Sequence, residues 1–223
     1  MTSEGRYFAA DAEYQAELTR RRIGEAECDP LTVRYLLRLG VGDGWRCLEV
    51  GAGAGSIVRW LSDRVGPNGA VVAADINTRF LDDLSEGNIE VRRFDITQDE
   101  PEVDAYDLVH CRWLLMHLDV PAAALRRMAR ALRPGGWLLV EEVDGRTMVA
   151  IDSAHQLAGG FNATSQKRLR ALHDRGIIDG YLGGFAAQVA GRSGLLGTSR
   201  TRGSRGLSPA ARRGRHTCRK PGG

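Results

Sequence analysis

The stretch Arg46-Cys-Leu-Glu-Val-Gly-Ala-Gly-Ala-Gly-Ser56 decides the fold of this 223-residue chain. Its first five residues form a short apolar run that is typical of a buried strand. Three glycines follow within the next five residues, and Ile57, Leu61 and Val65 then recur every four residues, which is the spacing of a helix. Glycines between a strand and a helix predict a tight turn that a ligand can approach closely. The N–H groups at the start of the helix favour an anion at the same place.

Strand and helix patterns alternate further along the chain. The expected strands cover residues 70–76, 89–96, 106–111 and 137–143, and helices are expected near residues 79–84 and 125–132. Strands that alternate with helices indicate a parallel sheet. Right-handed crossovers then give an α/β fold with a doubly wound, mostly parallel sheet, whose ligand crevice lies at the carboxyl ends of the strands.

The segment before the first strand is predicted to be helical. Residues 11–27 have the pattern of a polar, charged helix. Asp29-Pro30 resembles a helix start, with Asp as the N-cap and Pro at the first helical position. Apolar residues then recur at helical spacing as far as Gly40. We therefore expect two helices in the first 40 residues.

The overall composition is that of an ordinary soluble protein, with 43% hydrophobic and 26% charged residues. No apolar run approaches the ~20 residues of a membrane span, and residues 1–8 lack the pattern of a secretory signal. The four cysteines form no CxxC pair, which favours reduced thiols in a cytoplasmic protein over a disulfide framework or a metal site. We expect no membrane partner and no metal.

Positive charge is concentrated near the C-terminal end. The net charge is +3, but nine of the 31 Lys and Arg residues lie between Arg192 and Lys220, and the last acidic residue is Asp179. Residues 1–190 therefore carry a net charge of −6. No strand pattern follows Asp179, and residues 179–223 are rich in Gly and Arg, so we predict a disordered basic tail there.

Three acidic residues lie at the ends of the first three expected strands. Glu49 precedes the first glycine, Asp75 ends the second strand, and Asp95 ends the third. A carboxylate in the position of Asp75 is suited to accept hydrogen bonds from ribose hydroxyls. A diphosphate would be repelled by a carboxylate beside the glycine turn. The acids therefore favour a nucleoside that bears a cationic group.

Five motifs follow one another in a fixed order, and together they identify a family. They are Leu48 to Ser56, Ala74-Asp75, Phe94-Asp95, Tyr106 to His110, and Leu132 to Gly136. This set resembles the successive motifs of class I S-adenosylmethionine-dependent methyltransferases over about residues 30–145. The resemblance implies a Rossmann-like methyltransferase fold, with S-adenosylmethionine as the cofactor. It also implies an N-terminal helical lid over residues 1–45 and a cofactor-binding domain over residues 46–178.

The resemblance assigns roles around the glycine turn. Gly51, Gly53 and Gly55 would cradle the methionine part of the cofactor. Glu49 would face its ammonium group, directly or through water.

The resemblance also assigns roles on the nucleoside side. Asp75 would hold the ribose, and its alternative role is that of an ordinary helix cap. Ile76 would pack on the adenine. Asp95 and the backbone of Ile96 would recognise the adenine edge, with a turn residue as the alternative for Asp95. His110 would line the pocket near the transferred methyl group.

A general base is optional for methyl transfer, because alignment and exclusion of water supply much of the acceleration. His110 and His117 are the best two candidates for a base. The alternatives are a packed core histidine for His110 and a plain loop or helix residue for His117.

The acceptor is expected to be a small molecule. Methylases of amino groups in DNA or in protein glutamine carry an Asn/Asp-Pro-Pro-aromatic motif after the fourth strand, and residues 110–113 read His-Cys-Arg-Trp here. No specific nucleic-acid partner is therefore expected. Methylation on oxygen, nitrogen or carbon stays open.

Two other functions remain as alternatives. A nicotinamide-dependent oxidoreductase would need a third glycine at Ser56, and the Pro-Gly-Gly turn at 134–136 also argues against it. A binding protein that uses the basic tail would attract phosphate unspecifically. However, no Phe, Tyr or Trp that could stack on a base follows Phe185.

The tail departs from the family pattern. Members usually continue with a helix and an antiparallel strand pair that completes a seven-stranded sheet, and no such strands are recognisable here. A reading-frame shift near residues 178–190 and a genuine basic extension both explain this composition. In either case we expect cofactor binding to be better preserved than turnover.

Overall fold

A computed structural model of the chain describes residues 14–84 and 87–182. The chain divides into two compact units, Met1–Gly184 and Phe185–Gly223, and every described residue belongs to the first. Disorder was predicted from residue 179, but residues 179–182 are described, and Leu182 is buried in a core cluster. The rest of the predicted tail, from position 183 onward, lies outside the described residues.

A sheet of five parallel strands forms the centre of the described unit. The strands are β1 (Arg46–Val50), β2 (Ala70–Asp75), β3 (Ile89–Arg93), β4 (Tyr106–Arg112) and β5 (Leu132–Glu141). Their order across the sheet is β3-β2-β1-β4-β5, and all four neighbouring pairs are parallel. The predicted doubly wound, parallel α/β fold is therefore confirmed.

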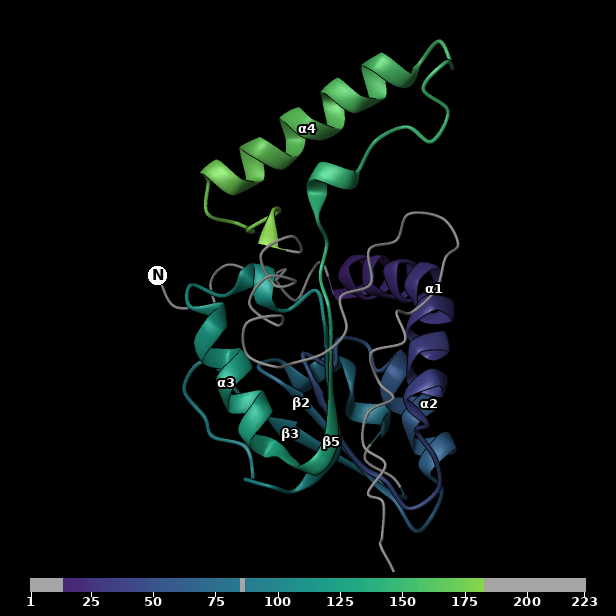
Figure 1. The fold of residues 1–223 in the computed structure, drawn as a ribbon, viewed down its shortest axis with the longest axis vertical. Coiled ribbons are helices and arrows are strands. Elements are labelled where there is room, and N and C mark those ends of the chain that lie inside the picture. The colour runs from purple at the N-terminus through teal and green to yellow at the C-terminus, as the bar shows by residue number, and fades with distance from the viewer. Residues whose placement is uncertain (1–13, 85–86, 183–223) are drawn as a thin grey trace, which may run out of the picture. The chain divides into compact units, whose positions relative to one another are not determined.

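Helices cover both faces of the sheet (Figure 1), with α3 on one face and with α1 and α2 on the other. The α-helices are α1 (Tyr14–Leu39), α2 (Ser56–Val65), α3 (Pro121–Ala131) and α4 (Ala158–Asp174). Four short 3-10 helices are η3 (Thr78–Phe80), η4 (Asp82–Leu84), η5 (Leu115–His117) and η6 (Gly145–Thr147). This arrangement buries the sheet on both sides, which explains the nearly continuous apolar character of its central strands.

Each face of the sheet has its own apolar core. On one face, Ala124 and Met128 of α3 pack over residues of β4, including Tyr106. On the other face, Ile57 and Leu61 of α2 pack with other apolar side chains of α2, β1 and β2. The four-residue spacing in α2 thus forms the buried face that its sequence predicts.

The site is positioned by the change of direction in the sheet. β1 pairs with β2 on one side and with β4 on the other. The chain therefore winds away from β1 in both directions, and a crevice opens at the carboxyl ends of these strands.

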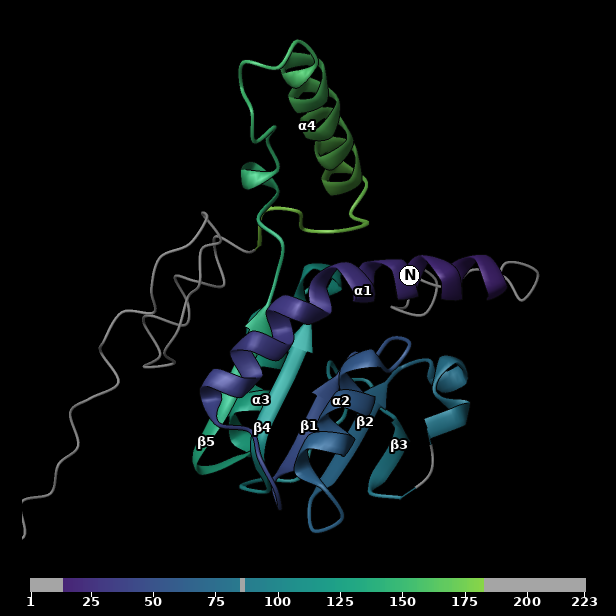
Figure 2. The same cartoon turned by 90° about the vertical axis from the view of Figure 1, so that its right-hand side faces the viewer.

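The prediction of two N-terminal helices was wrong, because α1 is continuous from Tyr14 to Leu39 with Pro30 inside it. Asp29 does not cap a helix. Its carboxylate accepts hydrogen bonds from Ser56 Oγ at 3.1 Å and from Arg112 Nη2 at 2.8 Å. Pro30 has no backbone N–H group to donate within the helix, and these tertiary contacts hold the chain in one helix in spite of that. α1 changes direction along its length (Figure 2).

The turn expected at Arg133 to Gly136 belongs to a strand. α3 ends at Ala131, and β5 begins directly at Leu132, before the expected start at residue 137. Gly135 has a φ of +85°, and the pairing of β4 with β5 is irregular between Tyr106 and Leu108. A glycine-containing irregularity lets the strand pass through a segment whose composition predicts a turn. The helix expected at 79–84 is instead a pair of 3-10 turns, η3 and η4.

Candidate active site

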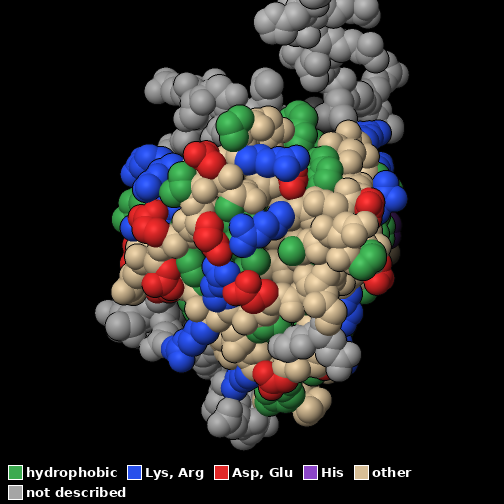
Figure 3. All heavy atoms as spheres, turned by 90° about the horizontal axis from the view of Figure 1, so that it is seen from below, with side chains coloured by type: hydrophobic (Ala, Val, Ile, Leu, Met, Phe, Trp, Pro, Cys, Tyr) green, Lys and Arg blue, Asp and Glu red, His purple; other side chains and the backbone are tan. Residues whose placement is uncertain are grey.

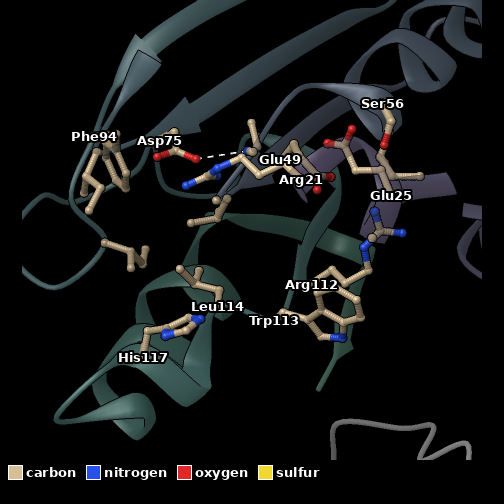
Figure 4. A pocket seen from close by; sticks show the side chains of 18 of the residues that line it. Arg21, Glu25, Glu49, Ser56, Asp75, Phe94, Arg112, Trp113, Leu114 and His117 are labelled. Carbon is tan, nitrogen blue, oxygen red and sulfur yellow. Dashed lines mark hydrogen bonds between the residues drawn. The ribbon is translucent and has the colours of Figure 1, made fainter. Parts of the chain in front are cut away.

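A cavity of about 210 Å³ lies at the carboxyl ends of β1, β2, β3 and β4, beneath α1 (Figure 4). It brings together eight of the residues expected from the sequence. They are Glu49, Gly51, Gly53, Asp75, Ile76, Asp95, Ile96 and His117.

Two expected residues, Gly55 and His110, are not among those that line the cavity. Gly55 has a φ of +83°, and a Cβ there would collide with the Leu84 side chain. Its glycine is therefore required by the turn and by packing. His110 is fully buried on β4, directly beside Glu49 of β1.

Glu49 and His110 form a buried pair behind the cavity. His110 Nδ1 lies 2.6 Å from Glu49 Oε2, and the two residues are 0% and 4% exposed. Burial alone would lower the pKa of His110, but the Glu49 carboxylate raises it, and the net shift is upward. His110 therefore contacts the cavity only through Glu49, whose carboxylate it orients.

Asp75 is held by the backbone at the end of β2. Its Oδ2 accepts a hydrogen bond from Gly53 N at 3.0 Å, and its Oδ1 accepts one from Asn77 N at 2.9 Å. Burial raises the pKa of Asp75, and these hydrogen bonds partly offset the rise. Each carboxylate oxygen has a second lone pair, so this fixed carboxylate can accept further hydrogen bonds on the cavity side.

Asp95 lines the cavity but is engaged in its own turn. Its Oδ1 accepts hydrogen bonds from Thr97 N at 2.9 Å and from Thr97 Oγ1 at 2.6 Å. Its Oδ2 accepts one from Gln98 Nε2 at 3.1 Å. This geometry fits the turn-residue alternative for Asp95, and less of its carboxylate is available to a ligand than at Asp75.

Side chains of α1 enter the cavity above the glycine turn. Glu25 Oε1 accepts a hydrogen bond from Ala54 N at 3.0 Å, and burial raises the pKa of Glu25. The Gly53 N–H already donates to Asp75. These two amides of the turn, which the sequence favours as an anion site, are thus occupied by carboxylates of the chain itself.

A polar network attaches α1 to the strand ends. Arg112 Nη1 donates to Thr32 Oγ1 at 2.8 Å, and Thr32 Oγ1 donates to Glu141 Oε2 at 2.7 Å. Arg112 Nη2 and Ser56 Oγ both donate to Asp29. The side chains of one helix therefore connect β4, β5 and the start of α2.

Another wall of the cavity, which meets the glycine turn where Leu114 approaches Gly51, is largely apolar. It includes Trp113, Leu114, Leu118 and Ile177. Trp113 has a φ of +55°, which is strained for a bulky residue. A Cβ on Gly24 of α1 would lie 3.2 Å from Trp113 Cζ3, so the glycine leaves room for the indole.

His117 provides an ionisable group within this apolar wall. The pKa of His117 is lowered to about 4, mainly by burial. The imidazole is therefore neutral near pH 7, and hydrogen bonding is the role it can play there.

The loop that carries this wall is held by Glu142, which follows β5. Glu142 Oε1 accepts hydrogen bonds from Leu114 N at 2.9 Å and from Leu115 N at 2.6 Å. Burial raises the pKa of Glu142 to about 7. A single buried carboxyl group thus fixes the start of η5 beside the cavity.

The sequence profile of a methyltransferase domain family matches residues 16–176. The chain belongs to this family, the class I S-adenosylmethionine-dependent methyltransferases.

Curated relatives of this methyltransferase are named ubiquinone/menaquinone biosynthesis C-methyltransferase UbiE. The protein from Pseudomonas savastanoi is 35% identical over 131 residues, which cover 55% of this chain and 51% of the relative. The protein from Ectopseudomonas mendocina is 36% identical over 118 residues, which cover 49% and 46%. The chain spans about half the length of these relatives. A solved methyltransferase from Aquifex aeolicus is 24% identical, with a TM-score of 0.45 over 50% of this chain and 63% of the other.

The cavity of this methyltransferase suits the cofactor of its family, S-adenosylmethionine. Carboxylates at the ends of β1 and β2 match an ammonium group and ribose hydroxyls. Phe94, Ile76 and Ile96 provide apolar surface for a flat ring, and Arg21 provides a cation for a carboxylate. The ammonium, carboxylate and ribose groups of the cofactor would each have a complementary side chain in the cavity.

Arg21, Glu25 and Trp113 also line the cavity, although the sequence pattern did not indicate them as cavity residues. Arg21 and Glu25 stand one turn apart in a charged helix, and this spacing was the available signal. Nothing in the sequence indicated which face of that helix would contact the strand ends. Trp113 directly follows β4, and this position was the available signal.

The described part of the chain contains no helix that is long and apolar enough to cross a membrane. Within the same residues, no group of three or more His, Cys, Asp or Glu side chains is arranged to hold a metal ion.

Proposed function

We propose that this chain transfers a methyl group from S-adenosylmethionine to a small molecule with an apolar, flat body. The observation that carries the proposal is one cavity with two different walls. The wall of glycines and carboxylates suits a cationic nucleoside. The wall around Trp113 suits an apolar acceptor.

On the cofactor wall, Asp75 accepts hydrogen bonds from the ribose hydroxyls, because its carboxylate is fixed by Gly53 N and Asn77 N. Glu49 faces the ammonium group, and His110 orients the Glu49 carboxylate. Gly51 lines the cavity with a φ of +77°, and a Cβ there would lie 3.3 Å from Leu114 Cδ1.

On the adenine side, Ile76, Phe94 and Ile96 enclose the ring. The backbone of Ile96 recognises the adenine edge, and Asp95 shapes the turn that presents it. Gly55 supports the site through the turn before α2 rather than by contact with the cofactor.

The bound cofactor supplies an electrophilic methyl group. The chain contributes position and exclusion of water, because α1 covers the cavity and η5 forms its floor. His117 is neutral and lies among apolar side chains, so it can hydrogen-bond a hydroxyl or amine of the acceptor. It is a better candidate than His110 to touch the acceptor, since His110 is fully buried.

The printed names of the UbiE relatives refer to quinone biosynthesis and to methylation on carbon. The apolar wall here, which includes Trp113, suits a ring compound, so ring compounds are the first acceptors to test. A cytoplasmic location remains a prediction.

Calorimetric titration with S-adenosylhomocysteine and with NAD tests the proposal. We expect binding of S-adenosylhomocysteine and no binding of NAD. Transfer of radiolabelled methyl from S-adenosylmethionine to a panel of flat aromatic and aliphatic acceptors then tests the acceptor class. Binding of NAD alone would overturn the proposal, and transfer only to aliphatic acceptors would overturn its acceptor part.

The nucleic-acid alternative finds no support on the face of the molecule seen in Figure 3. Basic and acidic side chains are interspersed there instead of forming one basic patch. Basic residues of the described unit are also engaged with acids, for example Arg92 with Glu102 and Arg127 with Glu100.

A further inference from the structure

We propose that Arg21 of α1 binds the carboxylate of the amino-acid part of S-adenosylmethionine. The inference rests on the proposed function and deepens it. It moves the binding of this carboxylate from the glycine turn, where the sequence favours an anion, to the helix that covers the cavity.

Two amides of the glycine turn already have partners. Gly53 N donates to Asp75, and Ala54 N donates to Glu25, both at 3.0 Å. Asp29 accepts a hydrogen bond from Ser56 at the start of α2. A ligand carboxylate brought to the start of α2 would meet these like charges. The helix N-terminus is therefore a poor site for it here.

Arg21 is held directly over the glycine turn. A Cβ on Gly53 would lie 3.8 Å from Arg21 Nη1. The guanidinium packs over the Phe80 ring, 4.9 Å from its centre, and Nε donates to Glu17 at 2.8 Å. The Arg21 side chain is 14% exposed, and Figure 4 shows it entering the cavity from α1, on the side opposite Leu114 and His117.

Two other arginines line the cavity but are worse placed. Arg20 has a side chain that is 61% exposed, and its Nε and Nη2 both donate to Glu17. Arg112 donates through Nη1 to Thr32 and through Nη2 to Asp29, which directs it toward the attachment of α1.

The charge of the cavity explains why such a cation is needed. Glu25, Glu49 and Asp75 all line the cavity near the glycine turn. These acids suit the ammonium and sulfonium groups of the cofactor, but they repel its carboxylate. A largely buried carboxylate needs a charged, hydrogen-bonding partner, and a guanidinium offers paired N–H donors of matching geometry.

The test compares two ligands that differ in one group. S-Adenosylmethionine and decarboxylated S-adenosylmethionine are titrated calorimetrically into the full chain and its variants. For Arg21→Met we expect about tenfold to hundredfold weaker binding of S-adenosylmethionine. Affinity for the decarboxylated ligand should stay within about twofold, because that ligand has no carboxylate to lose a partner.

Arg22→Met is the matched control, since it removes a neighbouring cation of α1 that is exposed and does not line the cavity. It should leave the affinities for both ligands within about twofold. Arg21→Lys retains the charge and provides a second variant if Arg21→Met does not fold, as judged by circular dichroism. It should weaken S-adenosylmethionine selectively, but less than Arg21→Met does.

Three outcomes would overturn the inference. Equal losses for both ligands would mean that Arg21 acts elsewhere, for example through Asp75 on the ribose. Unchanged affinity for S-adenosylmethionine in both Arg21 variants would mean that another group binds the carboxylate. Failure of the unmodified chain to bind either ligand would overturn the proposed function as well, so the two failures are distinguishable.

Discussion

Single carboxylates in this cavity behave differently because their neighbours differ. Asp75 is fixed by two backbone amides, Asp95 is engaged in its own turn, and Glu49 is paired with a buried histidine. All three lie at or just after strand ends. Asp95 is engaged by Thr97 and Gln98 of its own turn, whereas Asp75 is fixed by the distant Gly53 and can still accept from a ligand.

Asp75→Ala should weaken binding of S-adenosylhomocysteine by about 1–3 kcal/mol, because the ribose hydroxyls lose a charge-assisted acceptor. Asp95→Ala should weaken binding of S-adenosylhomocysteine less than Asp75→Ala does, since the Asp95 carboxylate already bonds to Thr97 and Gln98. Isothermal titration of both folded variants measures the difference. If Asp75→Ala binds as tightly as the parent, Asp75 serves only the amides of Gly53 and Asn77.

His110→Leu should lower the free energy of unfolding by about 3–5 kcal/mol, because it leaves the Glu49 carboxylate buried without its partner. Urea denaturation measures the change. The double variant Glu49→Leu/His110→Leu should be more stable than His110→Leu alone, since no unpaired charge remains. If the stability losses of Glu49→Leu and His110→Leu add up to the loss of the double variant, the two residues are not coupled.

At the scale of elements, α1 and η5 form the cavity from opposite sides. Both are held by polar groups that reach across to the strand ends, Asp29 and Thr32 from α1 and Glu142 from the end of β5. Leu36 of α1 and Leu115 of η5 are also fully buried in the apolar cores. Partly buried hydrogen bonds and apolar packing therefore position the two elements together.

Glu142→Gln should change how stability depends on pH. Burial raises the pKa of Glu142 from 4.5 to about 7. Between these values the folded chain binds a proton that the unfolded chain does not. The free energy of unfolding therefore falls as the pH rises from about 4.5 to about 7. The difference between the two pKa values corresponds to about 3 kcal/mol at most.

A glutamine retains the acceptor for Leu114 N and Leu115 N but does not titrate. We expect Glu142→Gln to be more stable than the parent at pH 8 and similar to it at pH 4.5, in urea denaturation at a series of pH values. Glu90→Gln, whose side chain is 57% exposed, should leave the slope of the profile unchanged. If the free energy of unfolding of Glu142→Gln and that of the parent depend on pH in the same way, the raised pKa of Glu142 is contradicted.

At the scale of the whole molecule, the site belongs to one of the two compact units. All residues that line the cavity lie between Arg20 and Ile177, within Met1–Gly184. The positive charge of the chain is concentrated after residue 190. We therefore expect binding of the nucleoside cofactor and any attraction to phosphate to depend on different stretches of sequence.

Deletion of residues 185–223 should leave the affinity for S-adenosylhomocysteine within about twofold of that of the full chain. The same deletion should abolish any binding of polyuridylate at low salt, because nine positive charges are lost. Calorimetry and a salt titration by fluorescence anisotropy measure the two effects. Polyuridylate binding that survives the deletion, or a large loss of cofactor affinity, would contradict this separation.

The order of patterns in the sequence determined the architecture of this protein. Strands that alternate with helices allow few topologies, and the apolar runs at β1, β2 and β4 could only be buried between two helical layers. The glycine turn and the acids at the strand ends also placed the cavity correctly, because the carboxyl ends of parallel strands meet at one edge of the sheet.

Only the tertiary structure decided what covers that cavity. The charged pattern of α1 does not say which face contacts the sheet, and local capping rules wrongly favoured a break at Asp29-Pro30. The break is absent because Asp29 bonds to Ser56 and Arg112, residues 27 and 83 positions away. The position of Arg21 over Gly53 and the burial of His110 also depend on contacts between distant parts of the chain. Contacts between distant parts of the chain depend on the packed fold, and no local pattern encodes them.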